Sequence, residues 1–356
     1  MMDLTTRYLG FTLKNPIVAS SSPLCDSLSR IRELEDNGIS AVVLPSIFEE
    51  QLEMEGRYFE ENLFRGTDSF GEALNYFPNL QGYNLGLDGY LELIRRAKSA
   101  VSIPVIASLN GTSRGGWIGY ARELSDAGCD AIELNLYSIV SDPRRTSLRI
   151  ENDYCDLVRD VKSTVSVPVA VKLSPFFTAP LNFAYQLDMA GADALVLFNR
   201  FYQPDLDIEQ LEAIPRLALS HSEDLLLRLH WTALIFGKIK AKLAITGGVH
   251  VAEDVIKCMM VGADVSMMAS ALLRNGPRHV SVLLANLTRW MEEHEYESIR
   301  QMQGSMCHRS VPNPTVFERI NYIRTLSSYA LSHGQGWASS DSSGTAFGVG
   351  SEESSQ

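Results

Sequence analysis

Short apolar runs recur along the chain, and four of them follow the same local pattern. In each, a glycine ends a helical stretch, two or three residues follow, and an uninterrupted apolar run begins. Glycine supplies positive φ without steric strain where a helix ends. An apolar run without polar alternation is typical of a strand that is covered on both faces, as in a parallel sheet. The four runs begin at Ala41, Ala131, Ala194 and Val265.

A second pattern lies between these runs and completes a set of eight. Ser102–Ala107 and Ser166–Val171 share a Ser-x-Pro-Val start, and each follows an amphipathic helical stretch. Pro16–Ser20 and Leu243–Thr246 add two more apolar runs. The predicted strands begin near residues 16, 41, 105, 131, 169, 194, 243 and 264. Eight alternating β–α units predict an α/β fold, a (β/α)8 TIM barrel, with an open doubly wound sheet as the alternative.

Three long segments follow predicted strands: 48–87, 137–152 and 200–229. All three lie at carboxyl strand ends, the face where barrel enzymes place their sites. Residues 291–326 are expected to form a helical C-terminal extension, and the tail from 332 is rich in Ser, Gly and Glu. We therefore predict one barrel domain with its extension over 1–330 and a disordered tail over 331–356.

Composition narrows the classes of function. The 356 residues carry a net charge of -12, which disfavours nucleic acid and anionic membranes as partners. No apolar run approaches the ~20 residues of a membrane span, and the N-terminus lacks the apolar core of a signal peptide. The five cysteines form no Cys-x-x-Cys pair, which argues against disulfide frameworks, zinc sites and iron–sulfur clusters. We expect a cytoplasmic protein without a metal.

Lys172 is the most informative polar residue, because it interrupts an otherwise apolar strand. A buried ammonium must be paired or functional. Lys172 could form an imine, pair with an anion or stabilise the negative charge of a reduced flavin, and a structural ion pair with Glu133 is the alternative. Asn135, at the end of the fourth strand, could bind the edge of a heterocycle.

The ends of the last two predicted strands have the composition of a phosphate site. Thr246-Gly247-Gly248-Val249 and Met268-Ala269-Ser270-Ala271 place small residues where backbone N–H groups can surround phosphate oxygens. A plain turn is the alternative. The histidines lack metal-like spacing and are expected to be surface or packing residues. Four aromatic side chains in or near the first long segment are expected to pack it and not to bind a cofactor: Tyr76, Phe77, Tyr83 and Tyr90.

Several motifs together resemble the class 1 dihydroorotate dehydrogenases. They are Lys14–Ser20, Glu133–Leu136, Val171–Pro175, Thr246–Val249 and Met268–Ala271. The resemblance extends from Leu4 to about Tyr296 and implies FMN as cofactor. It implies that Thr246, Gly247, Gly248, Ala269 and Ser270 hold the phosphate end, that Ala19, Ser20 and Asn135 contact the flavin, and that Lys172 faces its pyrimidine edge. Asn135 and Asn199 would line the substrate cavity.

The substrate side departs from the family pattern more than the flavin side. Ser138 stands where the family has its catalytic Cys or Ser, but Tyr137 and Ile139-Val140 replace its usual neighbours. Pro45 replaces a lysine of the second strand, and Arg200 replaces a small serine. The chain is therefore similar to a divergent branch of the family, and FMN binding is better supported than turnover of dihydroorotate.

The leading hypothesis is an FMN-dependent dehydrogenase of the dihydroorotate dehydrogenase type, acting on a CH–CH donor in pyrimidine biosynthesis. Ser138 and Lys172 would be the catalytic residues, with Ser138 as the base. An external acceptor or electron carrier would reoxidise the flavin. A second hypothesis is a flavin oxidoreductase with another substrate, a larger anion that Arg200 would bind. Two further hypotheses are a phosphate-binding lyase or isomerase that uses Lys172, and a non-catalytic flavin-binding protein. The resemblance also suggests a homodimer.

Overall fold

Eight parallel strands close into a barrel, as the sequence predicts. The computed structural model describes residues 2–52 and 86–327. The barrel strands in chain order are β3 (Ile17–Ala19), β4 (Val42–Phe48), β5 (Val105–Asn110), β6 (Ala131–Asn135), β7 (Val169–Leu173), β8 (Ala194–Leu197), β11 (Lys242–Thr246) and β12 (Val265–Met268). Each strand pairs with the next, and β12 pairs with β3 to close the ring. This rules out the open doubly wound sheet.

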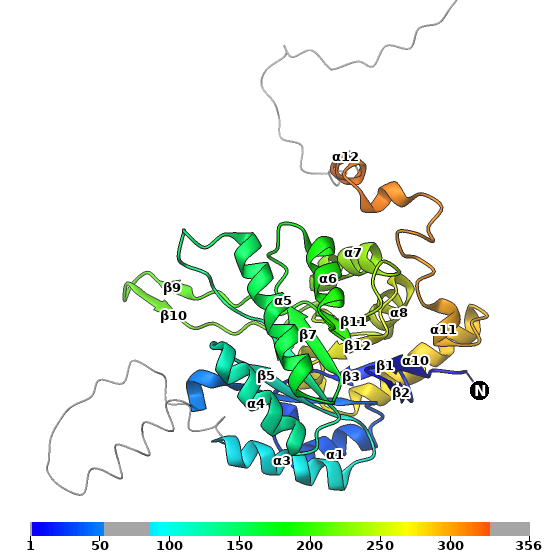
Figure 1. Ribbon diagram of the computed structural model, residues 1–356. Helices are drawn as coiled ribbons and strands as arrows, with labels where there is room; N and C mark the ends of the chain where they lie inside the picture. The colour runs from blue at the N-terminus through cyan, green and yellow to red at the C-terminus, as the bar shows by residue number, and fades with distance from the viewer. Residues whose placement is uncertain (1, 53–85, 328–356) are drawn as a thin grey trace, which may run out of the picture. The chain divides into compact units, whose positions relative to one another are not determined.

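Helices connect the strands and surround the barrel (Figure 1). In chain order they are α1 (Leu28–Asp36), α3 (Gly86–Ala100), α4 (Arg114–Asp126), α5 (Ser147–Thr164), α6 (Pro180–Met189), α7 (Leu226–Ile235), α8 (Ala252–Val261), α9 (Ser270–Asn275), α10 (His279–Glu293) and α11 (Ile299–Met302). Short 3-10 turns precede α1 (η1, Pro23–Cys25) and α7 (η2, Ser222–Leu225).

In three of the four glycine-terminated repeats the glycine is followed two residues later by an aspartate, and this aspartate has a structural role at the amino end of the barrel. Asp130 accepts a hydrogen bond from the backbone N–H of Val105, at the start of the neighbouring strand. It also forms an ion pair with Lys98. Asp193 and Asp264 repeat this arrangement two and four strands later in the ring. Each aspartate therefore satisfies a strand-end donor that has no ladder partner and joins consecutive β–α units.

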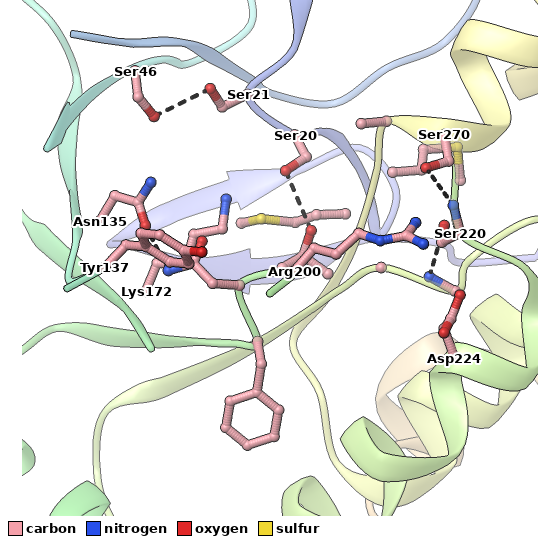
Figure 2. Close-up of a pocket in the computed structure, with 18 of the residues that line it drawn as sticks. Ser20, Ser21, Ser46, Asn135, Tyr137, Lys172, Arg200, Ser220, Asp224 and Ser270 are labelled. Atoms are coloured by element: carbon pink, nitrogen blue, oxygen red, sulfur yellow. Dashed lines mark hydrogen bonds between the residues drawn. The ribbon is translucent and has the colours of Figure 1, made fainter. Parts of the chain in front are cut away.

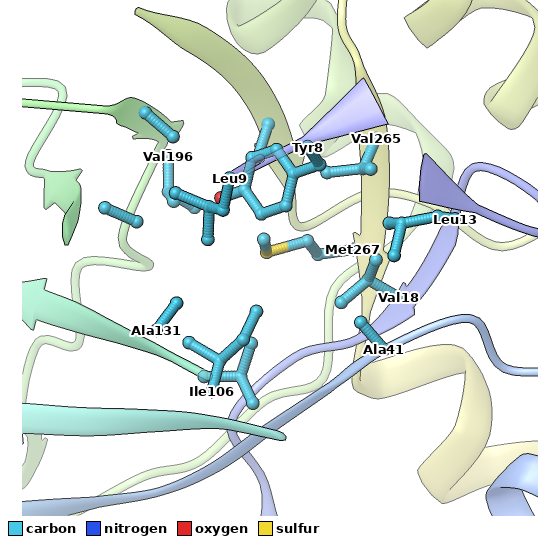
Figure 3. Close-up of a cluster of buried hydrophobic side chains, with 14 residues drawn as sticks. Tyr8, Leu9, Leu13, Val18, Ala41, Ile106, Ala131, Val196, Val265 and Met267 are labelled. Carbon is cyan, nitrogen blue, oxygen red and sulfur yellow. The ribbon is translucent and has the colours of Figure 1, made fainter. Parts of the chain in front are cut away.

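An N-terminal hairpin that sequence analysis missed closes this same end of the barrel. Strands β1 (Thr6–Tyr8) and β2 (Phe11–Leu13) pair antiparallel around Leu9-Gly10, both with positive φ. Tyr8, Leu9 and Leu13 are at most 2% exposed and pack on the first residues of the barrel strands (Figure 3). The signal was present in the sequence, because a two-residue loop ending in Gly between alternating residues favours a hairpin.

The long segments are more structured than expected. Residues 200–229 contain an antiparallel hairpin, β9 (Asp205–Asp207) with β10 (Glu212–Ile214), and the start of α7. The segment after β6 ends earlier than predicted, because Thr146 caps α5 with its side chain. Most of the first long segment lies outside the described residues, with Tyr76, Phe77 and Tyr83. Tyr90 packs in α3, where its hydroxyl accepts a hydrogen bond from the Ser108 N–H.

The chain divides into two units, Met1–Pro314 and Thr315–Gln356. The described part of the second unit contains most of a 3-10 turn (η3, Pro314–Phe317) and α12 (Ile320–Ser327), so helix is present in the predicted extension. The predicted tail lies outside the described residues, and the predicted boundary at 330/331 stays a prediction.

The hairpin that closes the barrel should contribute measurably to stability. Leu13→Ala removes a side chain that is 2% exposed and is expected to lower the free energy of unfolding by about 2–5 kcal/mol. Denaturant unfolding followed by circular dichroism measures this loss. Leu206→Ala, in the exposed hairpin β9–β10, is the matched control and should change stability by less than about 0.5 kcal/mol. Equal effects of the two substitutions would contradict the packing described here.

Candidate active site

A cavity of about 290 Å³ lies at the carboxyl ends of the barrel strands. All eight strands or the residues directly after them contribute to its lining, from Ser20 and Ser21 after β3 to Ala269 and Ser270 after β12. This volume is just below the roughly 300–1,000 Å³ that is usual for ligand pockets. Most predicted site residues line this cavity: Ser20, Asn135, Lys172, Asn199, Arg200, Thr246, Gly247, Gly248, Ala269 and Ser270. Ala19 is buried within β3 and is not among the lining residues.

Two polar pairs are formed by residues of β6, β7 and the segment directly after β8. Lys172 Nζ is 3.3 Å from Glu133 Oε1, and both side chains are buried. Asn135 stands in register with Lys172, and its Oδ1 accepts a 2.5 Å hydrogen bond from Asn199 Nδ2. Residues two apart on a strand share a face, so Glu133 and Asn135 both point into the barrel. The structural ion pair and a functional lysine are therefore compatible, because the ammonium also reaches the cavity.

The opposite end of the cavity is built from backbone and small side chains. Gly247 and Gly248 have φ of +87° and +83°, and a Cβ on Gly248 would lie 2.5 Å from the Leu225 nitrogen. Ser220 Oγ accepts a 3.4 Å hydrogen bond from the Gly248 N–H, and the Ser220 N–H donates to Ser270 Oγ at 3.1 Å. Figure 2 shows Ser220 and Ser270 facing each other at this end. A turn that only glycine can form, with open space beside it, fits the phosphate cradle expected from sequence.

Ser138 lies apart from these residues. Its side chain is exposed and its hydroxyl pairs with the Tyr154 hydroxyl. It lines a neighbouring hollow rich in aromatic residues, together with Tyr154, Phe176 and Phe177, and does not line the main cavity. Tyr154 is thus the hydrogen-bond partner of this serine. Burial raises the pKa of Tyr154, and the hydrogen bond from Ser138 opposes that rise.

Cationic side chains dominate the charged lining of the cavity. Lys172, Arg200 and Arg228 are the cations, and Asp224 is the carboxylate that lines it. Arg200 extends across the cavity towards Ser220 and Ser270 (Figure 2), and its Nη1 is buried without a partner among the described residues. The site of an acidic protein therefore carries surplus positive charge, which favours an anionic ligand.

Sequence analysis missed part of the lining, including Ser46, Asn110, Ser220, Asp224 and Arg228. One of these left a signal. Arg228 interrupts the apolar helix Leu226–Ile235, just as Lys172 interrupts its strand, and the same burial argument applies to both. The others come from loops and strand ends whose direction depends on the barrel, so no local pattern marks them.

Comparison with known proteins decides the family. A family model described as dihydroorotate dehydrogenase matches residues 3–291. The chain belongs to this family. It is accordingly an oxidoreductase, a flavin-dependent dehydrogenase, and the predicted resemblance is confirmed.

Curated relatives cover most of the chain at modest identity. The catalytic subunit of dihydroorotate dehydrogenase B (NAD(+)) from Thermoplasma acidophilum is 27% identical over 316 residues, covering 85% of this chain and 99% of the relative. The NAD-dependent dihydropyrimidine dehydrogenase subunit PreA from Escherichia coli K12 is 24% identical over 349 residues, covering 90% and 82%. The chain is similar to enzymes with two different named substrates.

Two further features bear on partners and cofactors. Among the described residues, no helix combines the length and apolar character needed to cross a membrane. The same residues contain no cluster of three or more His, Cys, Asp or Glu side chains suited to a metal ion. The five cysteines are free and buried.

The Gly247-Gly248 turn predicts a specific difference between two glycine substitutions. Gly248→Ala and Gly10→Ala both place a Cβ on a residue with φ of +83°, but the Cβ at Gly10 meets nothing within 4 Å. Both variants pay the cost of the left-handed conformation, about 1–2 kcal/mol. Only Gly248→Ala adds a clash with backbone, which typically costs a further ~1–3 kcal/mol. Denaturant unfolding of the two variants should show this gap, and equal stability would refute the close approach at Leu225.

Proposed function

We propose that this chain is an FMN-dependent dehydrogenase that oxidises a CH–CH bond in a small anionic substrate, with dihydroorotate as the first candidate. The observation that carries the proposal is the single cavity that joins Lys172 and the asparagine pair at one end to the Gly247-Gly248 turn at the other. Polar side chains at one end and a glycine turn at the other suit a ligand with a ring at one end and a phosphate at the other.

The residues present fit a flavin mononucleotide. Gly247, Gly248, Ala269 and Ser270 offer a turn without bulky side chains for the phosphate, next to Thr246. Ser20 Oγ, 3.2 Å from Thr246 Oγ1, lies between the two ends of the cavity (Figure 2). Ala19 does not line the cavity, so any contact of Ala19 with the flavin stays a prediction. Lys172 would face the pyrimidine edge. The flavin, when bound, would accept a hydride equivalent from the substrate.

The remaining steps are assigned to the protein's own side chains. Lys172, held by Glu133, would place positive charge where negative charge develops, which is the most effective kind of electrostatic stabilisation. Asn135 and Asn199 would orient the substrate through their amide groups. Ser138 would accept the substrate proton while its own hydroxyl proton passes to Tyr154, and the partly exposed Tyr154 hydroxyl would release its proton to solvent. Because Ser138 does not line the cavity, its role requires the segment after β6 to approach the substrate.

A specific observation favours a second substrate class. Arg200 fills part of the cavity and leaves its Nη1 without a partner among the described residues. A buried guanidinium nitrogen without an acceptor is costly. The flavin phosphate could supply an acceptor at the end of the cavity towards which Arg200 extends, and so could an anionic substrate larger than dihydroorotate. One matched relative is a dihydropyrimidine dehydrogenase subunit, which supports a range of cyclic substrates on this fold.

The lyase alternative loses its support. The family is one of flavin-dependent dehydrogenases, and an ammonium paired with Glu133 has no lone pair available to attack a carbonyl. An external acceptor or electron carrier would reoxidise the flavin and complete turnover. We propose that the protein works in the cytoplasm. Relatives named as subunits of NAD-linked enzymes support a partner protein for this step. A homodimer stays a prediction.

The visible spectrum of the purified full-length protein tests the proposal. We expect a yellow protein with one FMN per chain that bleaches on anaerobic addition of dihydroorotate. A yellow protein that stays oxidised would retain the cofactor and move the search to other CH–CH donors, with larger anions first. A colourless protein that FMN cannot reconstitute would overturn the proposed function.

Substitution of Ser138 tests the proposed base. Loss of a general base typically slows the chemical step by about 10²–10⁴-fold, so Ser138→Ala should reduce the anaerobic rate of flavin bleaching by that amount and leave the flavin bound. Ser147→Ala, in the same hollow as Ser138, is the matched control. A rate within about 3-fold of wild type in both variants would exclude Ser138 as the base.

A further inference from the structure

Arg228 is a buried cation that the proposed mechanism does not use. It lies in α7, and the residue is 8% exposed. All its hydrogen bonds go to main-chain carbonyls: Nε to Thr246, Nη1 to Asp224 at 2.5 Å and Nη2 to Phe198 at 3.4 Å. Within the part of the chain that the structure describes, no carboxylate forms an ion pair with it. The carboxylate of Asp224 instead accepts the His221 N–H at 2.9 Å.

The guanidinium lies directly against the glycine turn. A Cβ on Gly247 would be 2.9 Å from Arg228 Nη2 and 3.0 Å from Nε. The absence of a side chain at Gly247 therefore lets the cation approach the turn where the phosphate is expected. Arg228 lines the same cavity as Gly247, Gly248 and Ser270.

The charge of Arg228 is poorly compensated in this protein. Arginine stays protonated in proteins, and burial of an ion without a counter-ion is costly. Burial and the nearby charge of Arg200 lower the pKa of Arg228, while Asp224 acts in the opposite direction. Two guanidinium groups that repel each other beside an open cavity are stabilised when an anion enters it.

The guanidinium also keeps donors available. It has five N–H bonds. The three carbonyls accept hydrogen bonds from three of them, so two are available to a ligand. These carbonyls belong to the ends of β8 and β11 and to η2, so they hold the guanidinium in place before any ligand arrives. A cation that is fixed in advance binds an anion without the cost of ordering a long side chain.

We propose that Arg228 supplies the fixed positive charge that binds the phosphate of the flavin, beside the Gly247-Gly248 turn. This inference rests on the proposed function, because it takes FMN as the ligand. It assigns to α7 a binding residue in addition to the backbone turns after β11 and β12. Charge-assisted hydrogen bonds between arginine and phosphate are among the strong ones in proteins, so the protein should prefer FMN to riboflavin, which has the same ring and no phosphate.

The test compares the dissociation constants of FMN and riboflavin for the flavin-free full-length protein, measured by quenching of flavin fluorescence. Wild type should bind FMN at least about 10-fold more tightly. Arg228→Gln should weaken FMN by about 10- to 100-fold, as expected for loss of one or two charged hydrogen bonds, and riboflavin by no more than about 3-fold. Arg216→Gln, an exposed arginine paired with Asp205, is the matched control and should change neither constant.

Arg228→Lys covers the case in which the glutamine variant does not fold. It keeps the charge but has a single donor centre, so FMN should weaken less than in Arg228→Gln while riboflavin is unchanged. Equal weakening of both flavins in these variants would show that Arg228 only supports the fold and would overturn the inference. If the wild type binds riboflavin as tightly as FMN, the inference is overturned without any variant. The proposed function is then unaffected, because the protein still binds flavin. A wild type that binds neither flavin would overturn the proposed function together with the inference.

Discussion

Closure of a fully parallel barrel is the constraint on which the rest of this structure depends. Once β12 pairs with β3, the carboxyl ends of all eight strands meet on one face, and each contributes to a single cavity. The other end must then be sealed, because its strands expose apolar side chains to the interior. The hairpin β1–β2 provides this seal with Tyr8, Leu9 and Leu13, and the repeated aspartates satisfy the strand-end donors around it.

The same closure concentrates charge. Lys172 comes from a strand, Arg200 from the segment after β8 and Arg228 from a helix, and only the barrel brings them to one cavity. Glu133 compensates Lys172 directly, whereas backbone carbonyls are the hydrogen-bond acceptors of Arg228. A protein with a net charge of -12 thus maintains a locally cationic site. The negative net charge of the protein repels anions at long range, and the cations of the cavity attract them locally. The cavity therefore favours ligands that carry negative charge.

Membership of the dihydroorotate dehydrogenase family fits the strand-borne residues of the cavity better than the residues on the long segments. The glycine turn, Lys172 and the asparagine pair line the cavity, whereas Arg200 extends across it and Ser138 pairs with Tyr154 outside it. These two residues lie on long segments that follow strands, which change more freely than the strands because few core contacts constrain them. Arg200 and Ser138 therefore belong to the part of the site that the barrel constrains least.

The sequence by itself determined the barrel and the strand-borne part of the site. Eight apolar runs with glycine-terminated helices between them have few other packings, and Lys172, Asn135 and the Gly247-Gly248 turn could be found because each is a local exception within or directly after a strand. Only the tertiary structure decided which loop and helix residues join them. Arg228 reaches the glycine turn from α7, and Ser138 turns away towards Tyr154, because backbone direction outside the strands depends on contacts between segments far apart in the chain. Periodicity records what each element buries, and it carries no information on where the connections between elements meet.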